Sequence, residues 1–151
     1  MEGKELAQFM AQAAHETMNF YSLKELGQPN YFNKYDIQHN PGKAKALGNV
    51  EAGDGELYKG RGYLQITGRE NYRKCGEAIG LPLEDNPELL EDPTNAAKAS
   101  VWYWNTRVKP RVSNFDNTKA ATKHINPGLK GLKDREKKFA HYSKEVNNKH
   151  Q

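Results

Sequence analysis

Residues 60–68 of this chain read GRGYLQITG, a glycine-rich polar segment near the middle of the sequence. Glycine, proline and asparagine are scattered over 19–56 before it, which predicts a long loop with short helical turns around 30–36 and 43–47. A loop of this length inside a compact domain is usually functional. We therefore expect the glycine-rich segment to line a groove.

Helical patterns occupy most of the remaining sequence. Apolar residues recur at helical spacing near the N-terminus, and Asp92 followed by Pro93 is a strong start signal with Asp92 as N-cap. The predicted helices span 4–18, 69–79, 93–106, 117–125 and 131–146. The residues expected to be buried on the third of them are Ala96, Ala99, Trp102 and Tyr103, or their neighbours. Without internal repeats or a linker, residues 1–151 are expected to form one mainly α-helical, loop-rich domain.

The composition is that of a basic protein with a single cysteine. The 151 residues carry a net charge of +4, which favours an anionic partner such as nucleic acid, a membrane surface or a wall polysaccharide, although solvated lysines explain it equally well. Cys75 stands alone, which excludes an internal disulfide and predicts a half-buried structural thiol. The N-terminus has neither a basic nor an apolar region, and no apolar run is long enough to span a membrane. We therefore expect a protein made in a cytoplasm without a secretory signal.

Two carboxylates stand close together in sequence, Glu16 at the end of the first predicted helix and Glu25 nine residues later. Two carboxylates across a cleft can hydrolyse a glycosidic bond, one as proton donor and the other to activate water or to attack directly. Apolar surroundings near Glu16 favour a carboxyl group that keeps its proton, as a general acid needs. A surface glutamate is the alternative for Glu16, and a capping box with Ser22 is the alternative for Glu25.

The separation of the two carboxylates depends on where the first helix ends. Nine residues of unbroken helix would hold them roughly 13 Å apart. A break near Asn19 would permit the roughly 6.5–9.5 Å that inverting glycosidases use. The sequence therefore permits an inverting mechanism if the chain turns at this point.

The sequence contains no complete metal-binding or nucleotide-binding motif. His15 and Glu16 begin a zinc-protease motif, but Asn19 stands where its second histidine is required. The other histidines have no metal-ligand spacing, and residues 60–62 match neither a phosphate-binding loop nor a dinucleotide fingerprint. No metal or organic cofactor is expected. The basic C-terminal helix is expected to be solvated or to face a cell wall, not to bind nucleic acid specifically.

Four separated motifs together resemble glycoside hydrolase family 19, and more closely its bacteriophage endolysin branch. The motifs are AQAAHET over 11–17, LGN and GDG within 47–55, GRGYLQITGRENY over 60–72, and INPGL over 125–129 with Asp134 and Arg135. They occur in the family's order, and the resemblance extends from about residue 6 to 142. It implies a lysozyme-like, mainly α-helical fold of two lobes with the substrate groove between them.

The resemblance also implies roles for individual residues. Glu16 matches the family's general acid, and Glu25 matches the general base that positions the attacking water. Arg135 matches an arginine that bridges the catalytic carboxylates, and His15 stands beside the acid as a supporting residue. The residues that match the substrate-binding and water-positioning segments are Tyr63, Gln65, Thr67, Asn71 and Asn126.

The activity that the resemblance implies is that of a phage endolysin. Such an enzyme cuts β-1,4 bonds between the N-acetylated amino sugars of bacterial peptidoglycan, and we expect a monomer that is made in the host cytoplasm and acts on the wall. One alternative is a chitinase acting on N-acetylglucosamine polymers, which shares the chemistry. The other is a non-catalytic wall-glycan-binding module, against which stand both carboxylates and the set Gln65, Thr67 and Asn71.

Overall fold

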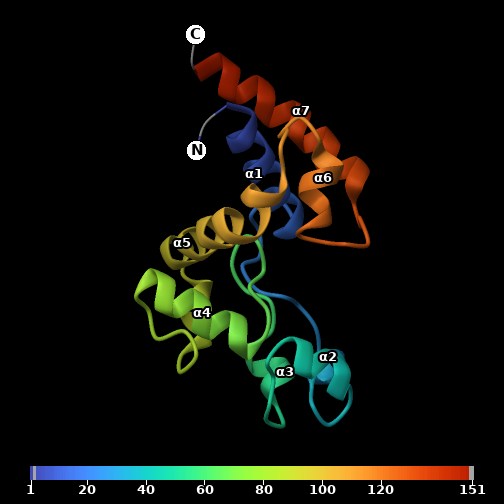
Figure 1. Ribbon diagram of the computed structural model, residues 1–151, viewed down its shortest axis with the longest axis vertical. Coiled ribbons are helices and arrows are strands. Elements are labelled where there is room, and N and C mark those ends of the chain that lie inside the picture. The colour runs from blue at the N-terminus through green and yellow to red at the C-terminus, as the bar shows by residue number, and fades with distance from the viewer. Residues whose placement is uncertain (2, 150–151) are drawn as a thin grey trace. The chain divides into compact units, whose positions relative to one another are not determined.

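The computed structural model describes Met1 and residues 3–149, and these form two compact units (Figure 1). The first unit combines the two ends of the chain, Met1–Tyr21 and the residues from Tyr103 onward, and the second unit is Ser22–Trp102. Helices dominate both units, so the predicted mainly α-helical, loop-rich fold is confirmed. Among the described residues, the strand-like pairings are isolated bridges from Arg61 to Lys24 and to Ile66. That the whole chain acts as one domain stays a prediction.

The helices of the first unit come from both ends of the sequence. They are α1 (Gly3–Glu16), the π-helical turn η3 (Trp104–Val108), η4 (Lys109–Arg111), α6 (Thr118–Lys123) and α7 (Leu132–Lys149). The helices of the second unit are η1 (Pro29–Tyr35), α2 (Pro41–Ala46), α3 (Asp54–Leu57), α4 (Arg69–Ile79), η2 (Pro87–Glu91) and α5 (Pro93–Tyr103). Most bounds lie within two residues of the predicted ones. The sequence analysis missed α3 and η2, because four or five residues are too few to show a period.

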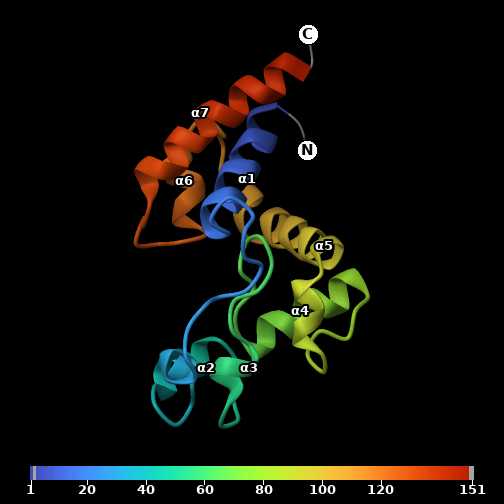
Figure 2. The same cartoon turned by 180° about the vertical axis from the view of Figure 1, so that it is seen from behind.

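The first unit is built around α1 and α7, which lie side by side in both views (Figure 1 and Figure 2). Small residues line the inward face of α1: Ala7, Ala11 and Ala14 are fully buried. Side chains of this size let neighbouring elements approach closely, and they leave room beside them for longer buried side chains. Helix α6 also packs on α7, so α7 joins the other two helices of the unit.

Aromatic burial at the end of α5 falls on a neighbour of the residues that were named. Trp104 is fully buried, whereas Trp102 and Tyr103 are half-buried. The reason is that α5 ends at Tyr103 and continues as the π-helical turn η3, whose wider winding changes which side chains point inward. The Trp104 ring meets Phe9 edge-on with centroids 5.5 Å apart and stacks on Phe115 at 5.9 Å.

Helix α1 ends at Glu16, and three consecutive left-handed residues follow it. Met18, Asn19 and Phe20 have φ angles of 52°, 61° and 68°, a region that costs an L-residue about 1–2 kcal/mol. The buried Thr17 hydroxyl supports this turn by accepting the Phe20 N–H at 2.8 Å. Of the two alternatives, the structure shows the break in the helix, and the spacing of an unbroken helix does not apply to Glu16 and the residues beyond.

The second unit is anchored by an ion pair between Asp54 and Arg69. The Asp54 carboxylate is 2 % exposed, receives two guanidinium hydrogen bonds of 2.8 and 2.9 Å, and also accepts the N–H groups of Val50 and Glu51. Burial alone would raise the pKa of Asp54, but these hydrogen bonds outweigh it and hold that pKa below its usual value. The pair thus fixes the start of α3 to the start of α4.

Cys75 on α4 is fully buried, whereas the sequence analysis expected a half-buried thiol, so the predicted extent of burial is wrong. Burial raises the pKa of this thiol to about 12, because the thiolate would lose its hydration. A thiol in this state is chemically inert, which agrees with the structural role that we expected.

Candidate functional site

Glu16 is the last residue of α1 and is held by Arg135 of α7. The Arg135 Nη2 donates to Glu16 Oε1 at 2.7 Å, and the two side chains are 1 % and 19 % exposed. The guanidinium reaches the end of α1 because it lies on the inward face of α7. The predicted neighbours Glu16 and Arg135 are thus brought together, although 119 positions separate them in sequence.

A chain of buried side-chain hydrogen bonds leads from the interior of the first unit to this ion pair. Gln8 Nε2 donates to Thr118 Oγ1 at 2.9 Å, Gln12 Nε2 donates to Gln8 Oε1 at 3.2 Å, and Arg135 Nη1 donates to Gln12 Oε1 at 2.6 Å. Both glutamines are fully buried. They precede Glu16 at intervals of four residues and therefore share its face of α1. The sequence analysis did not single out these glutamines, although this spacing was the available signal.

His15 lies beside the acid but contacts a different residue of α7. Its Nδ1 lies 2.6 Å from Asp134 Oδ2, and Lys138 donates to both oxygens of the same carboxylate. These bonds, that of Lys138 first, hold the pKa of Asp134 below its usual value. The imidazole also packs on Gly131, where a Cβ atom would lie 2.1 Å from His15 Cε1. His15 is therefore fixed in orientation by Asp134 and Gly131, and its role in supporting Glu16 stays a prediction.

Glu25 lies in the second unit, in the loop before η1, and is 18 % exposed. Its Oε2 accepts the Tyr35 hydroxyl at 2.9 Å, and its Oε1 accepts the Gly60 N–H at 3.2 Å. The backbone also pairs with Gly60, since Glu25 N donates to Gly60 O at 2.7 Å. The capping-box alternative for Glu25 is wrong. No helix begins directly after Ser22, and the Ser22 hydroxyl donates to Lys24 O instead.

Three predicted polar residues gather around Gly60, next to Glu25. A Cβ atom at Gly60 would lie 2.6 Å from Gln65 Oε1 and 3.2 Å from Thr67 Oγ1. Gln65 has φ of 54° and its Nε2 donates to Gly62 O, while Thr67 Oγ1 donates to Gln65 O. Asn71 on α4 donates to Thr67 O at 2.7 Å. Gln65, Thr67 and Asn71 thus form one cluster with the segment that holds Glu25.

The remaining two predicted substrate residues lie in different units. Tyr63 is half-buried in the glycine-rich segment of the second unit. Asn126 follows α6 in the first unit, where its Oδ1 accepts the Gly128 N–H at 3.1 Å and its own N–H donates to Thr122 O. The substrate and catalytic roles of all these residues stay predictions.

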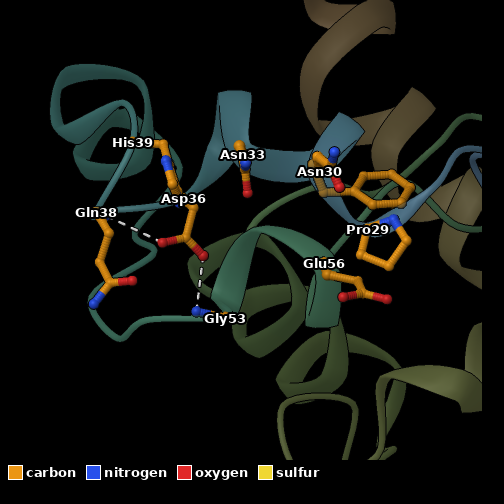
Figure 3. Close-up of a pocket in the computed structure, with 9 residues that line it drawn as sticks. Pro29, Asn30, Asn33, Asp36, Gln38, His39, Gly53 and Glu56 are labelled. Carbon is orange, nitrogen blue, oxygen red and sulfur yellow. Dashed lines mark hydrogen bonds between the residues drawn. The ribbon is translucent and has the colours of Figure 1, made fainter.

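A polar hollow of about 270 Å³ lies elsewhere in the second unit, between η1 and α3 (Figure 3). Asn30, Asn33 and Glu56 line it, and the Asp36 carboxylate at its wall accepts the N–H groups of Gln38 and Gly53 at 3.1 and 2.7 Å. None of the predicted site residues lines this hollow. It is therefore separate from the Gly60 cluster.

The described residues, Met1 and 3–149, contain neither a metal-binding cluster nor a membrane-spanning helix. No group of three or more His, Cys, Asp or Glu side chains in this part of the chain is arranged to hold a metal ion. No helix in it combines the length and apolar character that crossing a bilayer requires.

Pairs of carboxylates are the usual catalytic groups of glycoside hydrolases. Comparison with known proteins identifies the family. The class I chitinase domain of glycoside hydrolase family 19 matches residues 1–128, so the chain belongs to that family. The predicted family is thereby confirmed. The endolysin branch stays a prediction.

The similar proteins come from plants and bacteria. Endochitinase CH25 of Brassica napus is 34% identical over 113 residues, which cover 73% of this chain and 35% of that protein. A glycosyl hydrolase family 19 domain-containing protein of Haemophilus influenzae is 30% identical over 151 residues, 85% of this chain and 74% of that protein. The crystal structure of chitinase C from Streptomyces griseus HUT6037 superposes with a TM-score of 0.71 at 25% identity, over 95% of this chain and 60% of that one. The chain thus spans about a third of the length of the plant relatives it matches.

Proposed function

We propose that this protein is an inverting glycosidase that cuts β-1,4 bonds between N-acetylated amino sugars. The observation that carries the proposal is that the two predicted carboxylates have different fixed partners. Glu16 is paired with the buried Arg135, whereas Glu25 is held by Tyr35 and Gly60 within the polar cluster. Glycoside hydrolysis requires two carboxylates, one to give a proton to the leaving oxygen and one to accept a proton from water.

In this mechanism Glu16 protonates the leaving glycosidic oxygen, and Glu25 takes a proton from the attacking water. Thr67, which lies beside Gly60 and hence beside Glu25, helps to hold that water. Gln65, Asn71, Tyr63 and Asn126 contact the sugar chain. Water that attacks from the face opposite the leaving group inverts the anomeric carbon.

We further propose bacterial peptidoglycan as the substrate. Charge supports this choice, since the first unit carries thirteen Lys and Arg against seven Asp and Glu, whereas the second carries ten against twelve. A positive field draws a protein toward an anionic wall and gives no advantage on neutral chitin. The proposal extends to an endolysin that is made in a bacterial host and acts on the wall from the periplasm, binding as a monomer.

Chitin is the second candidate substrate, because several of the similar proteins are named as chitinases. The two activities are distinguished by incubating the protein with purified peptidoglycan and, in parallel, with chitin oligomers. Mass spectrometry of the released muropeptides identifies the bond by its new reducing end, and NMR of the fresh products gives their anomeric form. Release of α-anomeric muropeptides supports the proposal, whereas cleavage of chitin alone contradicts the endolysin assignment.

The Glu25→Gln variant is expected to hydrolyse glycan about 10²–10⁴-fold more slowly than the wild type, because glutamine cannot accept a proton from water. Wall binding, measured by co-sedimentation with purified peptidoglycan, should stay unchanged. The exposed Glu56→Gln variant, in the same unit, is the matched control and should keep its rate. A Glu25→Gln variant of normal activity would remove Glu25 from the base role.

The Gly60→Ala variant is expected to lose at least about tenfold in turnover at a stability cost of only about 1 kcal/mol. The new Cβ would meet the flexible end of Gln65, which can swing away and so leaves the fold intact but the polar cluster rearranged. Turnover and thermal unfolding are measured together. In the control, Gly42→Ala, the new Cβ enters open space on α2 and should change neither quantity adversely.

A further inference from the structure

Each carboxylate oxygen of Glu25 accepts one hydrogen bond. The Tyr35 hydroxyl donates to Oε2 at 2.9 Å, and the Gly60 N–H donates to Oε1 at 3.2 Å. Two donors on the two oxygens fix both the position of the carboxylate and its rotation about the last side-chain bond. One donor belongs to the backbone of the glycine-rich segment, so the other, Tyr35, is the side chain on which this geometry depends.

Tyr35 is itself rigidly placed at the end of η1. The fully buried Asn49 donates from Nδ2 to Tyr35 O at 2.9 Å, and its Oδ1 accepts the Arg69 N–H at the start of α4. Gly55 of α3 lies so close to η1 that a Cβ there would be 2.5 Å from Phe32 O and 3.1 Å from the Tyr35 carbonyl carbon. The backbone of Tyr35 is thus held in place by Asn49 and by the close packing of α3 on η1.

The Tyr35 hydroxyl keeps its proton and can therefore always donate a hydrogen bond to Glu25. Burial, and then the charge and hydrogen bond of Glu25, raise the pKa of Tyr35 well above its usual value, so its proton stays on the hydroxyl. Lys34 is the other candidate partner, with Nζ 3.8 Å from Glu25 Oε2. Its side chain is 44 % exposed, and an exposed ion pair at this distance contributes little.

We propose that Tyr35 is a positioning residue for the base, holding the Glu25 carboxylate in the orientation that receives a proton from the attacking water. Tyr35 acts through Glu25 and does not itself contact the reacting atoms. This inference rests on the proposed function, in which Glu25 is the base. Without the hydroxyl, the carboxylate would keep only the Gly60 donor and could rotate away from the water.

The test compares Tyr35→Phe with Tyr58→Phe, which removes another buried tyrosine hydrogen bond of the same unit, from Tyr58 to Glu84 O at 2.6 Å. In Tyr35→Phe we expect kcat on peptidoglycan fragments to fall about 10- to 100-fold, the effect of losing a hydrogen bond to a charged group, with KM unchanged. The Gly60 amide proton, observed by NMR, should also move, because its acceptor is released. Tyr58→Phe should lower the unfolding temperature but leave kcat and the Gly60 signal as in the wild type.

Each outcome bears on the inference. An unchanged kcat in Tyr35→Phe would overturn it while leaving the proposed function standing, provided that Glu25→Gln is inactive. A Gly60 signal that stays in place in Tyr35→Phe would show that the carboxylate is held without the phenol, and would also overturn it. If the wild type cleaves neither peptidoglycan nor chitin, the proposed function fails and the inference falls with it. Equal losses of kcat in both variants would assign Tyr35 a merely structural role.

Discussion

The Glu16→Gln variant is expected to hydrolyse peptidoglycan about 10²–10⁴-fold more slowly than the wild type, with binding of the glycan retained. Glutamine has nearly the same shape as glutamate and can still meet the Arg135 guanidinium through its amide oxygen. It has no acidic proton for the leaving oxygen, so the loss falls on the chemical step. The measurement is kcat on purified glycan fragments, together with co-sedimentation for binding.

Two comparisons make the Glu16 result decisive. Glu136→Gln, an exposed carboxylate on α7 of the same unit, is the matched control and should keep full activity. A substrate with an activated leaving group needs less help from an acid, so it should recover part of the rate lost in Glu16→Gln. A Glu16→Gln variant as active as the wild type would exclude Glu16 as the proton donor.

The Arg135→Met variant is expected to lose about 3 kcal/mol in free energy of unfolding, which lowers the melting temperature by about 6–12 °C in a chain of this size. Methionine fills much of the volume but cannot donate hydrogen bonds. The buried Gln12 Oε1 and the Lys130 carbonyl would therefore lose their donor, as would Glu16. Calorimetry measures the stability, and kcat is expected to fall as well because Glu16 is no longer held.

Arg73→Met is the control for this stability prediction. Arg73 is 44 % exposed, and its ion pairs within the described part of the chain are with Glu70 and Glu77 of its own helix, so its loss should change the free energy of unfolding by less than about 0.5 kcal/mol. Equal stability changes at the two arginines would contradict the buried network described for Gln8, Gln12 and Arg135.

The sequence predicted the helices well where local signals were strong. Asp92 does cap α5, since its Oδ2 accepts the Asn95 N–H, and Gly80 ends α4 with φ of 76°. The burial of Trp104 could not be predicted, because the π-helical turn that redirects it follows from tertiary packing and not from a sequence pattern. The same holds for the complete burial of Cys75, which depends on what covers α4.

The family resemblance predicted the site residues, whereas most of their hydrogen-bond partners became known only from the structure. Arg135 was expected near the carboxylates, and it does bind Glu16. Tyr35 was not expected, because a tyrosine ten residues after Glu25 carries no periodic signal when the chain between them is loop and 3-10 helix. The Gly60 amide could not be predicted as a partner of Glu25 either. Nearly every residue type has a backbone N–H, so the sequence does not show which one donates to a given carboxylate.

The first unit is assembled from the two ends of the chain, and this has a consequence for biosynthesis. Arg135, Gln12 and Glu16 can meet only after α7 has been made, because 119 positions separate Glu16 from Arg135. The second unit is continuous in sequence and is able to fold earlier, since domains generally form as their segments become available. On the ribosome, the partly made protein therefore contains Glu16 without the arginine that holds it. In the proposed function, catalytic competence therefore begins only when α7 packs against α1.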